Sequence, residues 1–129
     1  MKLLIATNNN GKKREISALF EGTSIELCFP EDLNLTTNIE ETGSTYAENA
    51  ALKAETLCRL SGLPALGDDT GLEVAALDGR PGLHSARYLP DPNATDADRR
   101  AKMLSELSGK PHPWGARFVC VVALAVPGE

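Results

Sequence analysis

The chain has 129 residues and a hydrophobic fraction of 42%, which fits one globular domain of ordinary composition. Its 13 Lys and Arg against 18 Asp and Glu give a formal net charge of -5, which argues against a surface that neutralises a nucleic-acid backbone. No apolar run approaches the ~20 residues of a membrane-spanning helix, and the N-terminus has no signal-peptide pattern. We therefore expect a cytoplasmic protein without a nucleic-acid or membrane partner, and an isolated nucleotide stays open as a ligand.

The cysteines give no sign of a disulfide or a metal site. Cys28, Cys58 and Cys120 are an odd number, are widely spaced, form no Cys-x-x-Cys pair and have no histidine at ligand spacing. We expect all three to be reduced and to lie in the core.

The first candidate site follows a predicted strand that covers Lys2 to Thr7 and stops at the turn-forming sequence Asn8-Asn9-Asn10-Gly11. Apolar residues at helical spacing then predict a helix over 12–20. The loop therefore lies at a helix N-terminus, where backbone N–H groups and the helix dipole attract anions. A turn with a solvated lysine is the alternative, because the loop lacks the Gly-x-x-x-x-Gly-Lys-Ser/Thr pattern. The candidate phosphate-binding residues are Thr7, Asn8, Asn9, Asn10, Gly11 and Lys12.

A second helix is predicted after a short strand over 25–29 and a polar loop. Thr45 and Glu48 stand at capping-box spacing, and the helix should end near Gly62. Its stripe of small residues, mostly alanine, allows a helix to approach a sheet closely. Lys53 lies on this helix and is a further candidate for phosphate binding.

Acidic residues occur at two places that flank this helix. Glu40 and Glu41 precede it on the loop, and a predicted strand over 63–66 stops at the sequence Gly67-Asp68-Asp69-Thr70-Gly71. Neighbouring carboxylates on a tight turn repel each other unless a cation lies between them, and hard oxygen ligands suit Mg²⁺. With the lysines, such a site could hold a Mg-nucleoside polyphosphate, and a solvated Asp-Asp turn is the alternative. The candidate metal ligands are Glu41, Asp68 and Asp69.

The second half of the chain carries fewer signals of chemistry. A strand is predicted over 72–77, and Arg87 follows in a loop as a weaker candidate for phosphate contact. Thr95 and Asp98 form a capping box that predicts a third helix. The segment 116–126 is the most apolar of the chain and predicts a strand that needs cover on both faces. The chain ends directly after it, so we expect part of that cover to come from sequence not present here.

Taken in order, these motifs resemble the inosine triphosphate pyrophosphatase family, the non-canonical purine nucleoside triphosphate pyrophosphatases. The match runs from Lys2 to about Leu124, and an ordered set is far more specific than any one motif. The segments that carry the resemblance are Ala6 to Lys12 with Glu15, Glu41-Thr42-Gly43 with Thr45, Glu48 to Ala54, Asp68 to Leu72, Arg80-Pro81-Gly82 and Ser85 to Tyr88.

The resemblance implies Mg²⁺-dependent hydrolysis of inosine, deoxyinosine or xanthosine triphosphate to the monophosphate and pyrophosphate, which cleanses the nucleotide pool. It implies that Glu41 helps to hold the metal and that Asp69 is both metal ligand and general base, with Asp68 beside it. Thr70 would lie near the substrate, and Lys53 would meet phosphate. The triphosphate loop would fall on Thr7, Asn9 and Lys12.

The same resemblance implies an α/β fold with a long twisted mixed sheet flanked by helices, a cleft between two lobes, and a homodimer. Members of the family continue past the position of Glu129 into a Phe-Gly-Tyr-Asp and a Ser-His-Arg segment that read the purine base, and neither is present. We therefore expect residues 1–129 to form a single pyrophosphatase-like domain that is incomplete at the C-terminus. The alternatives are a nucleotide-binding module without turnover and a pyrophosphatase for other nucleoside triphosphates.

Overall fold

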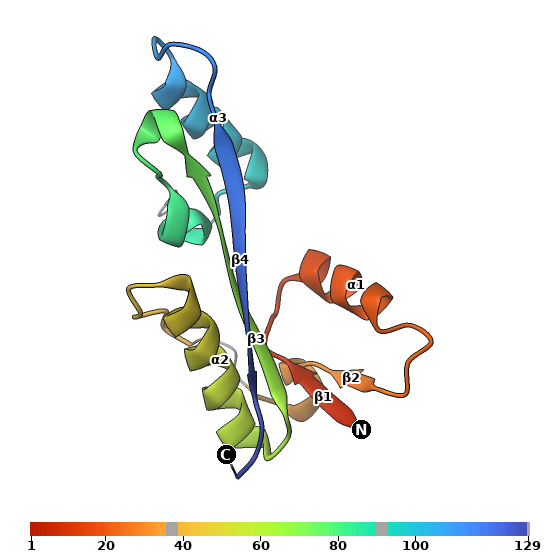
Figure 1. The fold of residues 1–129 in the computed structure, drawn as a ribbon. Helices are drawn as coiled ribbons and strands as arrows, with labels where there is room; N and C mark the ends of the chain where they lie inside the picture. The colour runs from red at the N-terminus through yellow and green to blue at the C-terminus, as the bar shows by residue number, and fades with distance from the viewer. Residues whose placement is uncertain (36–38, 90–92, 129) are drawn as a thin grey trace. The chain divides into compact units, whose positions relative to one another are not determined.

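The computed structural model describes residues 1–35, 39–89 and 93–128. Short 3-10 helices connect its main elements, which Figure 1 labels. Within the described ranges, no helix is long and apolar enough to cross a bilayer. The strands are β1 (Lys2–Ile5), β2 (Glu26–Cys28), β3 (Ala65–Val74) and β4 (Ala116–Ala125), and the helices are α1 (Asn10–Leu19), α2 (Tyr46–Ser61) and α3 (Asp96–Leu107).

The chain divides into two compact units. The first contains Met1–Asp69 and Val121–Glu129, and the second contains Thr70–Cys120. The strands β3 and β4 each contribute one part to each unit. We describe the units separately.

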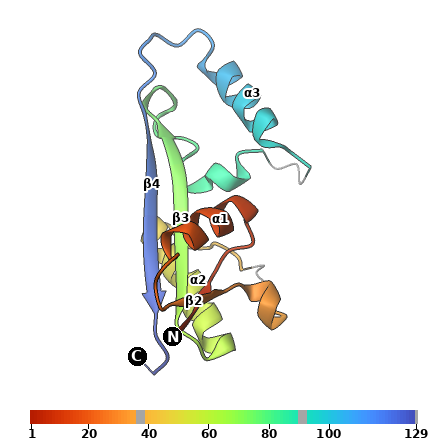
Figure 2. The same cartoon turned by 90° about the vertical axis from the view of Figure 1, so that its right-hand side faces the viewer.

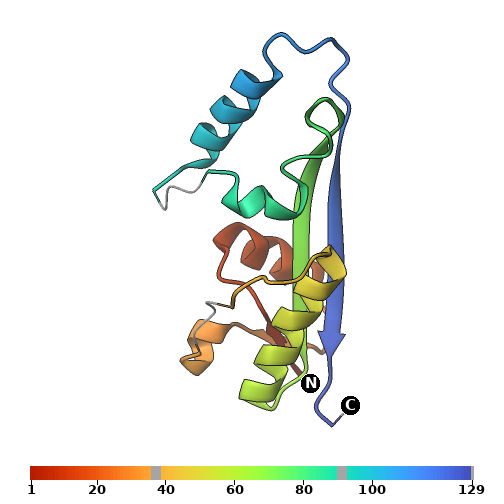
Figure 3. The ribbon, with the colours of Figure 1, turned by 90° about the vertical axis from the view of Figure 1, so that its left-hand side faces the viewer.

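The sheet of the first unit has the strand order β2-β1-β3-β4. Strand β1 pairs in parallel with both neighbours, so that Leu4 lies opposite Cys28 on one side and Ala65 on the other. Strand β4 runs against β3, which makes the sheet mixed (Figure 1). Helices α1 and α2 lie on opposite sides of β3 (Figures 2 and 3). Residues that alternate along β3 can therefore face different helices.

Local sequence explains why α1 and α2 begin where they do. The side chain of Asn9 accepts a hydrogen bond from the Lys12 N–H at 3.1 Å, and Thr45 does the same for the Glu48 N–H at 3.1 Å. Only half of the predicted capping box forms at α2, because the Glu48 carboxylate accepts from the Ser44 N–H. These caps satisfy N–H groups that have no partner inside the helix.

The small-residue stripe of α2 packs directly on β3, as the sequence predicts. Ala50 and Ala54 are buried, and a Cβ on Gly67 would lie only 2.4 Å from the Ala50 carbonyl oxygen and 2.8 Å from the Ala54 nitrogen. Leu4 of β1 and Leu57 of α2 belong to the same core cluster. The close approach of α2 to β3 therefore depends on a residue without a side chain at position 67.

The prediction of a turn at Gly67 to Gly71 is wrong. Strand β3 continues through these residues from Ala65 to Val74, and both aspartates are buried. Gly and Asp favour turns locally, but partners from distant segments hold this stretch extended. Asp68 pairs with Lys12, and Asp69 accepts a hydrogen bond from Asn49. Local turn preference is overridden by these tertiary contacts.

The second unit confirms the predicted capping box at the start of α3, where Thr95 and Asp98 bond each other's backbone N–H groups. The strand predicted over 72–77 is correct only for its first three residues, because 75–77 form a 3-10 turn. Ser85 serves a structural purpose, since its hydroxyl accepts from the Leu72 N–H at 2.8 Å and donates to the Gly82 carbonyl at 2.6 Å. The side chain of Arg87 lies outside the described residues.

Strand β4 is an edge strand with one apolar face open in the part of the chain described. Phe118 is 78% exposed, Val122 56% and Leu124 59%. Cys120 is also exposed, so the expectation of three core cysteines is wrong for this one, while Cys28 and Cys58 are buried and all three are free thiols. An apolar strand at a sheet edge offers both unpaired backbone groups and uncovered side chains.

Candidate phosphate-binding and metal-binding site

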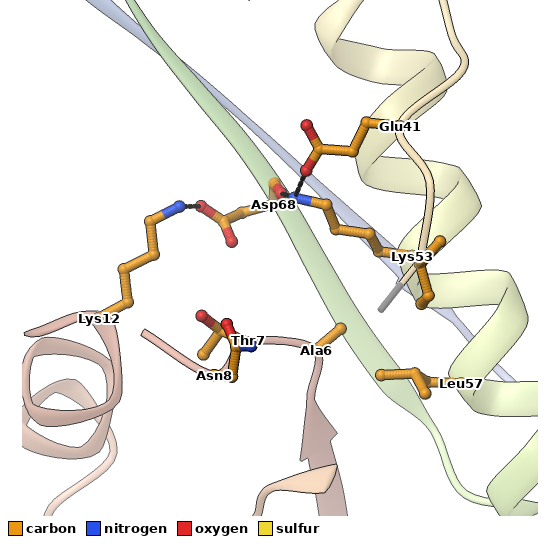
Figure 4. Close-up of a pocket in the computed structure, with 9 residues that line it drawn as sticks. Ala6, Thr7, Asn8, Lys12, Glu41, Lys53, Leu57 and Asp68 are labelled. Carbon is orange, nitrogen blue, oxygen red and sulfur yellow. Dashed lines mark hydrogen bonds and ion pairs between the residues drawn. The ribbon is translucent and has the colours of Figure 1, made fainter. Parts of the chain in front are cut away.

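A pocket of about 110 Å³ opens in the first unit, where the end of β1, the start of α1, α2 and β3 meet (Figure 4). Its volume is below the ~300–1,000 Å³ of typical small-molecule sites. The residues that line it are Ala6, Thr7, Asn8, Lys12, Ile39, Glu41, Lys53, Leu57 and Asp68.

The predicted phosphate loop forms one wall of this pocket. The Thr7 hydroxyl accepts a hydrogen bond from the Asn9 N–H at 3.1 Å, and Asn9 caps α1. Helix α1 begins at Asn10, two residues earlier than predicted, so Asn10 and Gly11 belong to its first turn. Thr7 and Asn9 thus shape the loop, and the backbone N–H groups of the first turn are the kind that bind anions.

Two lysines approach the same aspartate from opposite sides (Figure 4). The Lys12 Nζ donates to Asp68 Oδ2 at 2.7 Å. The Lys53 Nζ donates to the Asp68 backbone carbonyl at 2.9 Å and forms an ion pair with Glu41. Helix α1 supplies one cation and α2 the other, and β3 and the acidic loop supply the carboxylates. The pocket therefore brings together two cations and two carboxylates, which are paired with one another.

Asp69 differs from its neighbour in surroundings. It is 5% exposed, and its Oδ2 accepts a hydrogen bond from the Asn49 Nδ2 at 3.2 Å. Burial raises the pKa of this carboxyl above its usual value, the Glu41 charge raises it further, and the Asn49 hydrogen bond opposes the shift. A carboxylate with a raised pKa is a better proton acceptor near neutral pH. Burial also means that a bound cation would stabilise its charged form.

The structure does not bring the three predicted metal ligands into one cluster. Among the described residues, no group of three or more His, Cys, Asp or Glu side chains is placed to hold a metal ion. Successive side chains of a strand point to opposite faces, and Asp68 contacts α1 whereas Asp69 contacts α2. The charge of Glu41 lies close enough to Asp69 to raise the pKa of the Asp69 carboxyl. Their oxygens fit Mg²⁺, which is usually bound by one or two carboxylates together with substrate phosphates and water.

The chain matches the Ham1 family over residues 3–129. It belongs to this family. A curated relative from Geobacter sulfurreducens, a dITP/XTP pyrophosphatase, is 47% identical over 98% of this chain and 64% of its own length. Another dITP/XTP pyrophosphatase, from Syntrophobacter fumaroxidans, is 50% identical over 97% of this chain and 53% of its own length. The chain thus spans less than two thirds of the length of these relatives. The family predicted from the ordered motifs is confirmed.

Solved structures of Ham1 proteins have the same fold. A HAM1 protein from Coxiella burnetii is 40% identical, with a TM-score of 0.84 over 96% of this chain and 62% of that protein. The Staphylococcus aureus Ham1 protein is 36% identical, with a TM-score of 0.82 over 100% of this chain and 65% of that protein. The predicted α/β fold with a mixed sheet flanked by helices is therefore confirmed.

Asn49 is a residue of this Ham1 chain whose place in the site could not be seen from the motifs alone. Asn49 is fully buried on α2 and is bonded at both ends of its amide. The sequence did contain an indication that Asn49 lies at the site, because Lys53 follows four residues later and residues at this spacing share a helix face. A polar residue beside Ala50 on a packed face must have hydrogen-bond partners. Thr70 is the first residue of the second unit, and only the sequence assigns it to the site.

Proposed function

We propose that this chain supplies the phosphate-binding and metal-binding part of an enzyme that hydrolyses dITP, XTP and ITP to the nucleoside monophosphate and pyrophosphate. Relatives named dITP/XTP pyrophosphatase, at 47% and 50% identity, support this activity. The observation that carries the proposal is the convergence of Lys12 and Lys53, from two different helices, on Asp68 in one pocket.

In this proposal the two lysines bind the phosphates of the substrate. Lys12 and Lys53 are point charges on flexible stems, which suits a polyphosphate more than a planar base. When phosphate oxygens enter the pocket, they compete with Asp68 for Lys12 and with Glu41 for Lys53. The lysines also stabilise the negative charge that develops on the departing pyrophosphate.

Asp69 would accept the proton from the water that attacks the α-phosphorus. The new bond joins the water oxygen to the α-phosphorus, and the bond from this phosphorus to the bridging oxygen of pyrophosphate breaks. Glu41 and Asp69 would hold Mg²⁺, which supplies positive charge to the phosphate oxygens when bound. General-base assistance of this kind is worth ~10²–10⁴ in rate.

The remaining properties stay predictions from the sequence. They are a role in cleansing the nucleotide pool, a cytoplasmic location, a homodimer, and recognition of the purine base by residues outside the phosphate pocket. The charged side chains of this pocket would bind the phosphates of any nucleoside triphosphate and would not distinguish one base from another. Selectivity between bases requires buried polar groups that the wrong base leaves unpaired.

The purified protein, assayed with dITP, XTP and dATP in the presence and absence of Mg²⁺, tests the proposal. We expect pyrophosphate and monophosphate in equal amounts, and no activity without the metal. Asp69→Asn is the matched control for a contaminating hydrolase. Release of orthophosphate in place of pyrophosphate would contradict the proposed reaction. Tight binding of Mg-dITP without turnover would favour the nucleotide-binding module instead.

A further inference from the structure

Asn49 is a fully buried polar residue in the first turn of α2. Its Oδ1 accepts a hydrogen bond from the Gly43 N–H at 2.8 Å, and its Nδ2 donates to Asp69 Oδ2 at 3.2 Å. Gly43 belongs to the loop that carries Glu41, whereas Asp69 belongs to β3. One amide group thus joins the two segments that carry the carboxylates proposed to hold the metal.

The chemistry of the partners fixes the orientation of this amide. A backbone N–H can only donate, so the Asn49 carbonyl must face Gly43, and the amide NH₂ is then directed at Asp69. The arrangement leaves no space for a side chain at position 43, where a Cβ would lie 2.6 Å from Asn49 Oδ1. The backbone N–H of Asn49 donates a hydrogen bond to the Thr45 carbonyl at 3.2 Å. The side chain is therefore held at its base and at both ends of the amide.

We propose that Asn49 is a positioning residue for the hydrolysis, which orients the Asp69 carboxylate and holds the Glu41 loop next to it. This inference rests on the proposed function of Asp69. Lys53 lies one turn further along the same face of α2, so one helix presents both the amide that orients Asp69 and the ammonium group that meets phosphate. A group held at one rotamer by two partners keeps a reacting carboxylate in its productive geometry.

The substitution Asn49→Asp tests this role with little change in shape. The new side chain retains an oxygen for the Gly43 N–H but loses the donor to Asp69. We expect kcat for dITP to fall by about 10- to 100-fold while KM changes by less than about threefold, because Lys12 and Lys53 are unaltered. Ala47→Asp, which adds the same charge at an exposed position of the same helix turn, should retain wild-type kcat and KM.

A purely structural role for Asn49 predicts a different result. The melting temperature would fall, and the specific activity would fall only in proportion to the folded fraction. Wild-type kcat in a folded Asn49→Asp protein would also overturn the inference. The parallel Asp69→Asn assay separates the two claims, because an active Asp69→Asn protein would contradict the function proposed for Asp69 whatever the Asn49 variant does.

An NMR measurement tests the hydrogen bond between Asn49 and Asp69 directly, without an activity assay. The side-chain amide signal of Asn49 in an NMR spectrum, identified by its loss in Asn49→Asp, should exchange slowly with solvent. Its chemical shift should move when Asp69 is replaced by Asn. Rapid solvent exchange, or no response to the change at position 69, would show that the amide does not bond Asp69 and would overturn the inference.

Discussion

The Lys12 Nζ lies 2.7 Å from Asp68 Oδ2, which joins the first turn of α1 to strand β3 across 56 residues of sequence. The Lys12 side chain is 31% exposed and the buried Asp68 side chain 12%, so solvent screens this pair mainly on the lysine side. In the proposed function the pair matters for binding, because a phosphate oxygen would replace Asp68 as the partner of Lys12.

The first prediction is that Lys12→Gln weakens binding of all nucleoside triphosphates alike. A charge-assisted hydrogen bond is worth about 1.5–3 kcal/mol, so KM should rise by roughly 10- to 100-fold for dITP and dATP equally. Steady-state kinetics with both substrates measure this. Lys13→Gln is the matched control, since Lys13 pairs with Glu31 and does not line the pocket. A change in the preference between dITP and dATP, with overall affinity kept, would contradict a role at the phosphates.

The second prediction is that a substitution of Asp68, the partner of Lys12, strengthens anion binding. Asp68→Asn removes the carboxylate that competes with phosphate for this lysine. We expect the protein to bind inorganic pyrophosphate several-fold more tightly than the wild type in calorimetry without metal. Weaker binding would show that Asp68 supports the anion site instead of occupying its lysine.

The third prediction is that Asp69→Asn lowers kcat by at least ~10² at saturating Mg²⁺, because an amide cannot accept the proton of the attacking water. The phosphate contacts remain, so KM should change little. Single-turnover measurement of pyrophosphate release would separate chemistry from product release. If the variant hydrolysed dITP at a rate close to that of the wild type, Asp69 would not be the base.

The fourth prediction tests the close packing of α2 on β3. Gly67→Ala places a methyl group 2.4 Å from the Ala50 carbonyl oxygen, and we expect a loss of about 1–3 kcal/mol in the free energy of unfolding. Gly115→Ala is the control, because its nearest neighbour would be 4.0 Å away. Chemical denaturation of both variants would measure the difference, and equal midpoints would contradict the packing argument.

The fifth prediction follows from the open face of β4. Val122 and Leu124 are both mostly exposed, and we expect the 129-residue chain to associate at micromolar concentrations. The double substitution Val122→Lys with Leu124→Lys should reduce this association with little effect on unfolding, because both side chains are already more than half exposed. Sedimentation at several concentrations would show it, and a wild-type chain that stays monomeric would refute the prediction.

The helices and most of the strands could be predicted because their signals are local. The cap residues Asn9 and Thr45 and the alanine stripe of α2 lie within a few residues of the features that they determine. The Gly67 to Gly71 segment could not be predicted in the same way, since Gly and Asp have turn preferences. What keeps it extended are Lys12, 56 residues before Asp68, and Asn49, 20 residues before Asp69.

The candidate site shows the same division. The residue types at Lys12, Lys53 and Asp68 indicated charge chemistry, and the structure places them around one pocket. The sequence could not show that Asp68 and Asp69 have different partners, since alternation along a strand appears only once the strand itself is known. For the same reason Asn49 was missed, because its importance depends on two segments that fold against it.

The pairing of charges in the pocket has a consequence for the form in which substrate is accepted. Two ammonium groups, on Lys12 and Lys53, face the carboxyl groups of Glu41 and Asp68, and Asp69 adds a third. A triphosphate without metal therefore meets no surplus of positive charge. In the magnesium complex, the phosphates could pair with the lysines and the Mg²⁺ ion with the carboxylates. If the proposed function holds, we expect the magnesium complex of the nucleotide to be the species that binds, so that turnover rises with the magnesium concentration as well as with the nucleotide concentration.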